Sequence, residues 1–71
     1  MRQRGTVRAF DRQRGYGFIA RQGGAPDLFV HKTAFTYPDV FVGDEVEFLE
    51  IEGPRGPKAV GVTKTEPPRA A

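Results

Sequence analysis

The sequence contains no cysteine, no serine and no tryptophan, and His31 is its only histidine. Without cysteine, neither a disulfide framework nor a thiolate zinc cluster is available to support a small fold. Because nucleophilic catalysis commonly pairs a serine or cysteine with a histidine, the composition also argues against an enzyme. We therefore expect no catalytic residue, no metal site, no cofactor and no small-molecule substrate.

Long apolar runs are absent as well. No stretch approaches the length of a membrane-spanning helix or of the apolar core of a secretory leader. We therefore expect a cytoplasmic protein without a membrane partner, and the lack of cysteine agrees with a reducing compartment. The 71 residues suffice for one domain with a thin core, which packing alone must hold together as a monomer.

Charge is unevenly distributed along the chain, although the net charge is only +2. Residues 1–21 carry six arginines against one aspartate, residues 22–52 one lysine against seven acids, and residues 53–71 four basic residues against one acid. A basic first third and an acidic middle third are consistent with one positive side, as in a phosphate-binding protein. An ordinary solvated surface would produce the same pattern, so charge alone does not decide.

Glycine and proline interrupt short runs rich in valine, phenylalanine and threonine, and no stretch has the 3.6-residue period of a helix. The pattern predicts an all-β protein with strands at residues 5–12, 16–21, 27–32, 45–51 and 58–65. Tight turns join the first three strands, and longer connections follow over 33–44 and 53–57. Five short strands favour a closed antiparallel β-barrel, because closure removes exposed strand edges.

The chain divides into a basic N-terminal extension over residues 1–4, one folded domain over 5–66 and a tail over 67–71 that we expect to be disordered. Within the fourth predicted strand, Phe48 and Leu49 are adjacent apolar residues. Their adjacency breaks the alternation of a strand and predicts a β-bulge.

Alternation in the second and third predicted strands assigns an aromatic set to one face of the sheet. Ile19, Leu28 and Val30 fall on one side and form a core face. The opposite side carries Tyr16, Phe18, Phe29 and His31. A sheet that already buries one apolar face has no structural need for four rings on the other, so the rings indicate an interaction surface. The structural alternatives are packing under the 33–44 connection and cross-strand pairing.

Basic residues flank the four rings, namely Arg8, Arg12, Arg14 and Lys32. Unpaired bases stack on aromatic rings while cations follow the phosphates, so the combination indicates a partner that is single-stranded RNA or DNA. Gly15 and Gly17 lie among the rings in sequence and would let a base or a backbone approach closely.

Two motifs in this region resemble those of a known family. Arg14–Ile19 reads RGYGFI and Asp27–His31 reads DLFVH, which resemble the two nucleic-acid-binding motifs of bacterial cold-shock proteins and cold-shock domains. The resemblance extends to GTVR at 5–8, VGDEVEF at 42–48 and GPRGPKAVGV at 53–62. The RNA-recognition motif also uses RGYGF, but it needs two helices and places its other aromatic strand before this segment. The resemblance implies a bacterial protein with an OB-fold of the cold-shock type.

By this resemblance Tyr16, Phe18, Phe29 and His31 stack bases, Arg8 and Arg14 contact the strand, and Arg55 lies near it in the last loop. Phe10 and Phe35 are further candidates, and the alternatives for them are a strand-end core position and a loop anchor. Lys32 completes the candidate site as a cation next to His31.

The chain departs from the family pattern within the candidate site. Ala9 stands where the family has a tryptophan and Lys32 where it has an aromatic residue, so two stacking platforms are missing. Asp11 replaces an asparagine and adds a negative charge near the face. Tyr37 or Phe41 could replace a lost loop aromatic.

Further along, Val60 and Gly61 stand where the family has alanine and asparagine. The altered face leaves two hypotheses. The first is a low-specificity single-strand binder with RNA-chaperone-like activity, and the second is a barrel that has become a protein-interaction module. Stacking and phosphate contacts do not read the 2′-hydroxyl, so the sequence favours neither RNA nor DNA.

Overall fold

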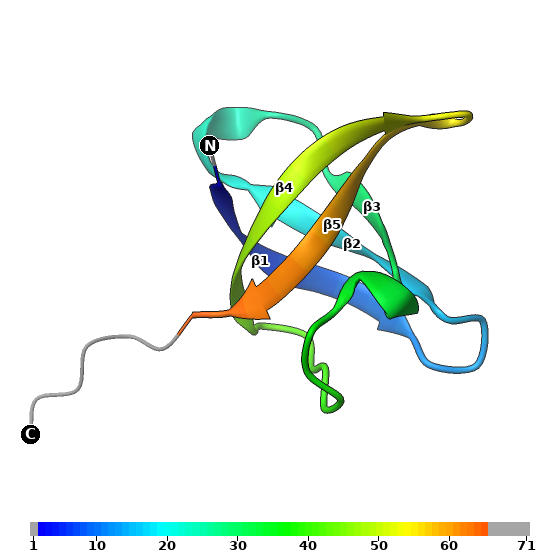
Figure 1. Ribbon diagram of the computed structural model, residues 1–71. Coiled ribbons are helices and arrows are strands. Elements are labelled where there is room, and N and C mark those ends of the chain that lie inside the picture. Colours follow the sequence, from blue (N-terminus) through cyan, green and yellow to red (C-terminus); the bar gives the residue numbers. More distant parts are fainter. Residues whose placement is uncertain (1, 66–71) are drawn as a thin grey trace, which may run out of the picture.

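The structure is a computed structural model that describes residues 2–65. Its elements are β1 (Gln3–Asp11), β2 (Tyr16–Arg21), η1 (Gln22–Gly24), β3 (Leu28–His31), η2 (Lys32–Ala34), β4 (Glu45–Gly53) and β5 (Gly56–Lys64). Figure 1 shows the strands wrapped around one another, with the tip of the β4–β5 hairpin projecting at one end. The predicted tail over 67–71 lies outside the described residues. Within the described part, no helix is long and apolar enough to span a membrane.

The strands close into a barrel in the order β1-β2-β3-β5-β4. Four ladders are antiparallel, and β3 pairs with β5 in parallel. A closed ring with an odd number of strands cannot alternate direction all the way around, so one parallel ladder is unavoidable. The predicted five-stranded all-β barrel is therefore confirmed, with this one exception to its antiparallel order.

Three strand ends extend beyond their predicted positions. β1 begins at Gln3 because residues 3–6 pair with β4, so Gln3 and Arg4 of the predicted N-terminal extension lie in the strand. In the last hairpin Gly53 pairs with Gly56, which reduces the predicted 53–57 loop to a two-residue turn of Pro54 and Arg55. The φ angle of Gly56 is 117°, a backbone conformation that glycine adopts without steric cost.

The barrel interior is filled by small and medium apolar side chains. Its buried residues are Val7, Ile19, Leu28, Val30, Val40, Val46, Phe48, Ala59 and Val62. Each fully buried aliphatic or phenylalanine side chain stabilises the fold by about 1.5–3 kcal/mol relative to an exposed one. The prediction that Ile19, Leu28 and Val30 face the core is confirmed.

The irregularity predicted at Phe48 is present, although the extra residue lies in the partner strand. Between the pairs Glu47–Thr63 and Leu49–Val60, Phe48 alone faces the two β5 residues that separate Val60 from Thr63. Phe48 points into the core on the same side of β4 as Val46, and Leu49 points outward and is exposed, so alternation in β4 continues past this point. Gly61 lies in the bulge with a φ of 58°, in the left-handed region that glycine and asparagine adopt most readily. Because both residues adopt this conformation readily, Gly61 can replace the asparagine that the cold-shock pattern has at this position.

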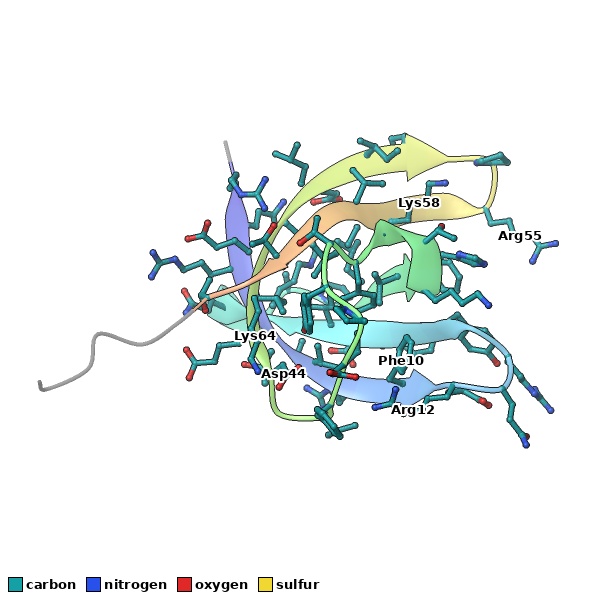
Figure 2. All side chains as sticks on the ribbon, turned by 60° about the horizontal axis from the view of Figure 1, so that its bottom comes forward. Phe10, Arg12, Asp44, Arg55, Lys58 and Lys64 are labelled. Atoms are coloured by element: carbon teal, nitrogen blue, oxygen red, sulfur yellow. The ribbon has the colours of Figure 1, made fainter. Side chains whose placement is uncertain are left out.

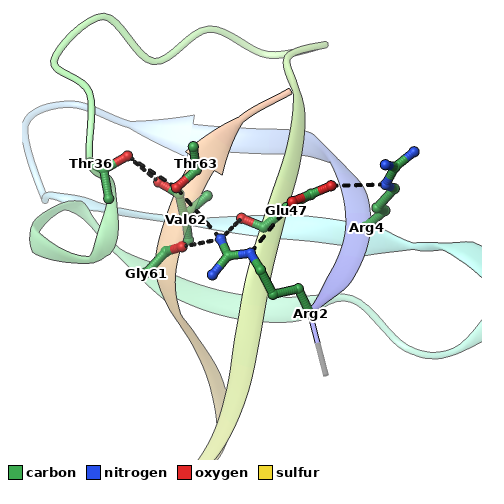
Figure 3. Close-up of polar contacts among 7 residues, drawn as sticks. All are labelled: Arg2, Arg4, Thr36, Glu47, Gly61, Val62 and Thr63. Atoms are coloured by element: carbon green, nitrogen blue, oxygen red, sulfur yellow. Dashed lines mark hydrogen bonds and ion pairs between the residues drawn. The ribbon is translucent and has the colours of Figure 1, made fainter. Parts of the chain in front are cut away.

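The first two arginines of the described chain contact β4 and β5 beside this bulge (Figure 3). Arg2 Nη2 donates to the carbonyl oxygens of Gly61 at 2.8 Å and Glu47 at 3.1 Å. Arg2 Nε and Arg4 Nε lie 3.5 Å and 3.1 Å from the two carboxylate oxygens of Glu47. The N-terminal charge of this protein therefore ties β1 to β4 and β5.

Candidate nucleic-acid interface

The four candidate rings lie together on the outer face of β2 and β3. Tyr16 is paired with His31, and Phe18 with Phe29. Because directly paired residues on neighbouring strands point to the same side, all four rings share one face, as the alternation predicted. Phe18 and Phe29 are 39% and 36% exposed. An apolar surface of this kind is available to a partner.

Contacts among the rings hold them in a defined arrangement. The centroids of Tyr16 and Phe29 are 5.8 Å apart with an interplanar angle of 28°. Phe18 meets Tyr16 and Phe29 edge to face, at centroid distances of 6.4 Å and 6.0 Å. Such spacings are favourable for aromatic pairs. The rings thus form cross-strand pairs and still remain partly open to solvent, so the pairing alternative does not exclude an interaction surface.

His31 is held in place by the turn that follows it. Its Nδ1 atom accepts a hydrogen bond from the backbone N–H of Thr33 at 3.2 Å and lies 2.9 Å from Thr33 Oγ1. Since Nδ1 accepts a backbone hydrogen, the neutral ring carries its proton on Nε2. The two contacts cap η2 and fix the orientation of the imidazole beside Tyr16.

The β1–β2 turn uses the charge of Asp11. Asp11 Oδ1 accepts hydrogen bonds from the backbone N–H groups of Gln13 and Arg14, each at 3.0 Å. The Tyr16 phenol and, to a lesser extent, the Asp11 carboxylate raise the pKa of Arg14. Asp11 therefore serves the turn, and its charge is partly balanced by the Arg14 guanidinium, 3.8 Å away.

Gly17 is required because the β1 backbone leaves no room for a side chain at this position. A Cβ atom at Gly17 would lie 2.2 Å from the Ala9 carbonyl oxygen, and one at Gly15 would lie 2.9 Å from Lys32 Cδ. The close approach expected from the sequence is present, and the approaching groups are the β1 backbone and the Lys32 side chain. Gly15 also has a φ of 77°, which the tight turn requires.

Phe10 and Phe35 occupy a different environment from the four rings. They meet edge to face with their centroids 5.5 Å apart, and both pack against the core. β1 contains a register shift between Val7 and Ala9, which places Phe10 opposite the buried Gly17. This packing agrees with the strand-end and loop-anchor alternatives. Both rings also line a hollow of about 530 Å³ next to Lys32, so part of each faces solvent.

Of the two loop aromatics, Phe41 is the accessible one. The hydroxyl of Tyr37 donates to Asp44 Oδ2 at 3.0 Å, and burial, together with this bond to the carboxylate, raises the pKa of Tyr37. Phe41 is 59% exposed, and the Arg12 guanidinium lies 5.1 Å from its ring centroid. Arg12 also donates to the Val40 carbonyl oxygen. Arg12 therefore anchors the loop.

Most arginines of the basic first third are engaged with acids. Ion pairs join Arg2 and Arg4 to Glu47, Arg8 to Asp27, Arg14 to Asp11 and Arg21 to Glu50. The positive side expected from residues 1–21 is therefore largely neutralised by acids folded against it. Exposed ion pairs are worth only about 0–1 kcal/mol, so Arg8 and Arg14 can exchange a carboxylate for a phosphate.

Within residues 2–65, four arginine or lysine side chains make no ion pair: Arg12, Lys32, Arg55 and Lys58. Arg12 is engaged by the Val40 carbonyl oxygen and the Phe41 ring, which leaves the other three. Lys32 follows His31 at one end of the aromatic face. Arg55 and Lys58 lie at the other end, where both line a hollow with Phe29. Sequence reasoning missed Lys58, because only the parallel β3–β5 register brings it beside Phe29.

Comparisons with known proteins agree with this geometry. A sequence profile described as 'Cold-shock' DNA-binding domain matches residues 3–65. The chain is similar to Cold shock protein CspB of Geobacillus stearothermophilus, with 45% identity over 65 residues that cover 87% of this chain and 97% of the relative. Cold shock protein CspD of Bacillus subtilis matches with the same identity and coverage. The solved structure of drosophila Unr CSD456 superposes with a TM-score of 0.79 at 27% identity, over 100% of this chain and 29% of that one.

Proposed function

Because the chain belongs to the cold-shock DNA-binding domain family, we propose that it binds single-stranded RNA or DNA across the outer face of β2 and β3. The chain is a binding domain and not an enzyme. The observation that carries the proposal is the cluster of Tyr16, Phe18, Phe29 and His31 on the outer face, in which Tyr16 is half-buried and the other three are exposed, with contacts between the strands. No packing requirement of the barrel interior accounts for this cluster.

Binding would combine stacking with charge. Each base that stacks on an aromatic ring contributes about 1–3 kcal/mol, and because every base has a π face, such stacking discriminates little between sequences. Arg8, Arg14, Lys32 and Arg55 surround the rings and are the proposed phosphate contacts. A protein that holds unpaired strands in this way would also oppose hairpin formation, which is the basis of RNA-chaperone-like activity.

We also place the protein in the bacterial cytoplasm as a monomer. The bacterial cold shock proteins to which it is similar support the first part, as does a composition without cysteine. The closed barrel supports the second, because each of the five strands within residues 2–65 is paired on both sides and offers little edge to another chain.

The proposal is tested by titrating a fluorescently labelled pyrimidine-rich oligomer and its duplex with the protein. We expect the single strand to bind and the duplex to bind far more weakly, because duplex bases are not free to stack on the rings. An oligomer of about 4–7 nucleotides should suffice, at the lower end of the range for one OB-fold. Identical curves for the two forms would contradict the proposal, and the absence of binding to either would favour the protein-interaction module.

The two missing platforms give a second test. Ala9 is exposed and paired with Phe18, so Ala9→Trp should add a ring beside the cluster and tighten binding without changing its salt dependence. Lys32→Phe should add a stack and remove a cation, which makes the slope of log affinity against log salt shallower by about 0.7. Oligomer titrations at several salt concentrations measure both effects. If neither variant tightens binding, the nucleic acid does not cross this part of the face.

A further inference from the structure

Lys58 extends the outer aromatic face onto a third strand. In the parallel β3–β5 ladder Phe29 is paired with Lys58 and Val30 with Ala59. Val30 and Ala59 are both buried, so Lys58 shares the outer side with Phe29. The surface that carries the rings on β2 and β3 therefore continues across β5 toward the β4–β5 turn.

Lys58 lines two hollows on the surface of the barrel. The first, of about 390 Å³, is lined by Phe29, Lys58 and the turn residues Gly53, Pro54, Arg55, Gly56 and Pro57. The second, of about 320 Å³, adjoins His31 on β3 and Val60 on β5. Lys58 lines both, so its ammonium group is within reach of a ligand in either hollow.

The electrostatics of the first hollow favour an anion. No acid is among its lining residues, and neither Arg55 nor Lys58 has an ion-pair partner within residues 2–65. The nearest acids of β4, Glu50 and Glu52, are paired with Ala59 and Pro57 and so point to the side opposite Lys58. Figure 2 shows Arg55 and Lys58 together at the hairpin end, well away from Phe10 and Arg12.

The shape of the hollow suits a nucleotide. Glycine and proline form most of its wall, and a Cβ atom at Gly56 would have no neighbour within 4 Å, so the space above the turn is open. Its volume is within the range of small-ligand sites, and Phe29 forms part of its lining. An aromatic wall next to two cations matches a base or sugar joined to a phosphate.

We propose that Lys58 and Arg55 bind the phosphate of one additional nucleotide, whose base or sugar occupies the hollow against Phe29. The bound strand then leaves the aromatic face across β5 and ends over the β4–β5 turn. This inference rests on the proposed single-strand binding and specifies where the strand leaves the face. It makes Lys58 a binding residue in addition to those that the sequence predicted.

The test compares Lys58→Gln with Arg4→Gln, which removes the same charge from a pair with Glu47 on another part of the barrel. Binding of oligothymidylates of graded length is measured by fluorescence between 0.1 M and 1 M salt. For the longer oligomers we expect Lys58→Gln to make the salt slope shallower by about 0.7, which corresponds to about fivefold weaker binding at 0.1 M if the affinities agree at 1 M. Arg4→Gln should follow the wild-type protein.

Neutral methylphosphonate linkages then locate the contact. Moved along the oligomer, a single neutral linkage should weaken wild-type binding at one terminal position and weaken Lys58→Gln less at that position, because in the variant only Arg55 still contacts the phosphate there. If Lys58→Gln behaves as Arg4→Gln at every length, salt concentration and linkage position, the hollow is not a nucleotide site. In that case Phe18→Ala still reports on the aromatic face, so the proposed function is tested independently. Equal thermal unfolding of the two variants excludes a loss of fold as the cause.

Discussion

Replacement of Phe48 by alanine is expected to lower the free energy of unfolding by about 3–5 kcal/mol. Phe48 is fully buried at the centre of the core, so truncation leaves a cavity that the surrounding strands can fill only in part. Domains of this length have a total stability of about 4–10 kcal/mol, at about 0.05–0.15 kcal/mol per residue. The variant should therefore be largely unfolded at moderate urea, which circular dichroism measures.

Leu49→Ala is the matched control, because it truncates the adjacent apolar residue. Leu49 is 38% exposed on the other side of the β4–β5 irregularity, and its loss should cost less than about 1 kcal/mol. Equal destabilisation by the two substitutions would mean that Leu49 is packed as Phe48 is, and that the assignment of Phe48 to the core and Leu49 to the outer side is wrong.

Phe18→Ala and Phe29→Ala are each expected to weaken single-strand binding by about 1–3 kcal/mol, the range for loss of one base-aromatic stack. The free energy of unfolding should change far less, because both rings lie on the outer face and are more than a third exposed. Oligomer titration and urea unfolding of the same preparations separate the two quantities.

Val42→Ala provides the control for loss of an exposed apolar side chain, since Val42 is 64% exposed in the loop before β4. It should leave binding unchanged. Variants at Phe18 and Phe29 that unfold while their folded fraction binds normally would show that these rings are core residues. Conversely, a full loss of binding in Val42→Ala would move the interface from the sheet to the loop.

The aromatic face was predictable because it depends on local geometry. Side chains of a strand alternate between its two sides, so the positions of Tyr16, Phe18, Phe29 and His31 followed from their spacing alone once the strands were placed. The same alternation identified Ile19, Leu28 and Val30 as core. In each case the cause lies within a few residues of the chain.

The distribution of available charge was not predictable in this way. The six arginines in residues 1–21 suggested a positive side, yet Asp11 and three acids from residues 22–52, namely Asp27, Glu47 and Glu50, pair with five of them. Ion pairs join residues far apart in sequence, such as Arg21 and Glu50 at 2.9 Å. Which cations remain for a phosphate is therefore a consequence of the fold.

By itself the sequence determined the all-β class, the number of strands, the two faces of β2 and β3 and the resemblance to the cold-shock family. These features follow from period-2 alternation, turn residues and short motifs, all of which act over a few neighbouring residues. Only the tertiary structure decided that β3 pairs with β5 in parallel, that Phe10 packs against the core, and that Lys58 lies beside Phe29. The reason is physical: barrel closure and β-bulges set the register between strands that are distant in the chain, and register determines which side chains meet.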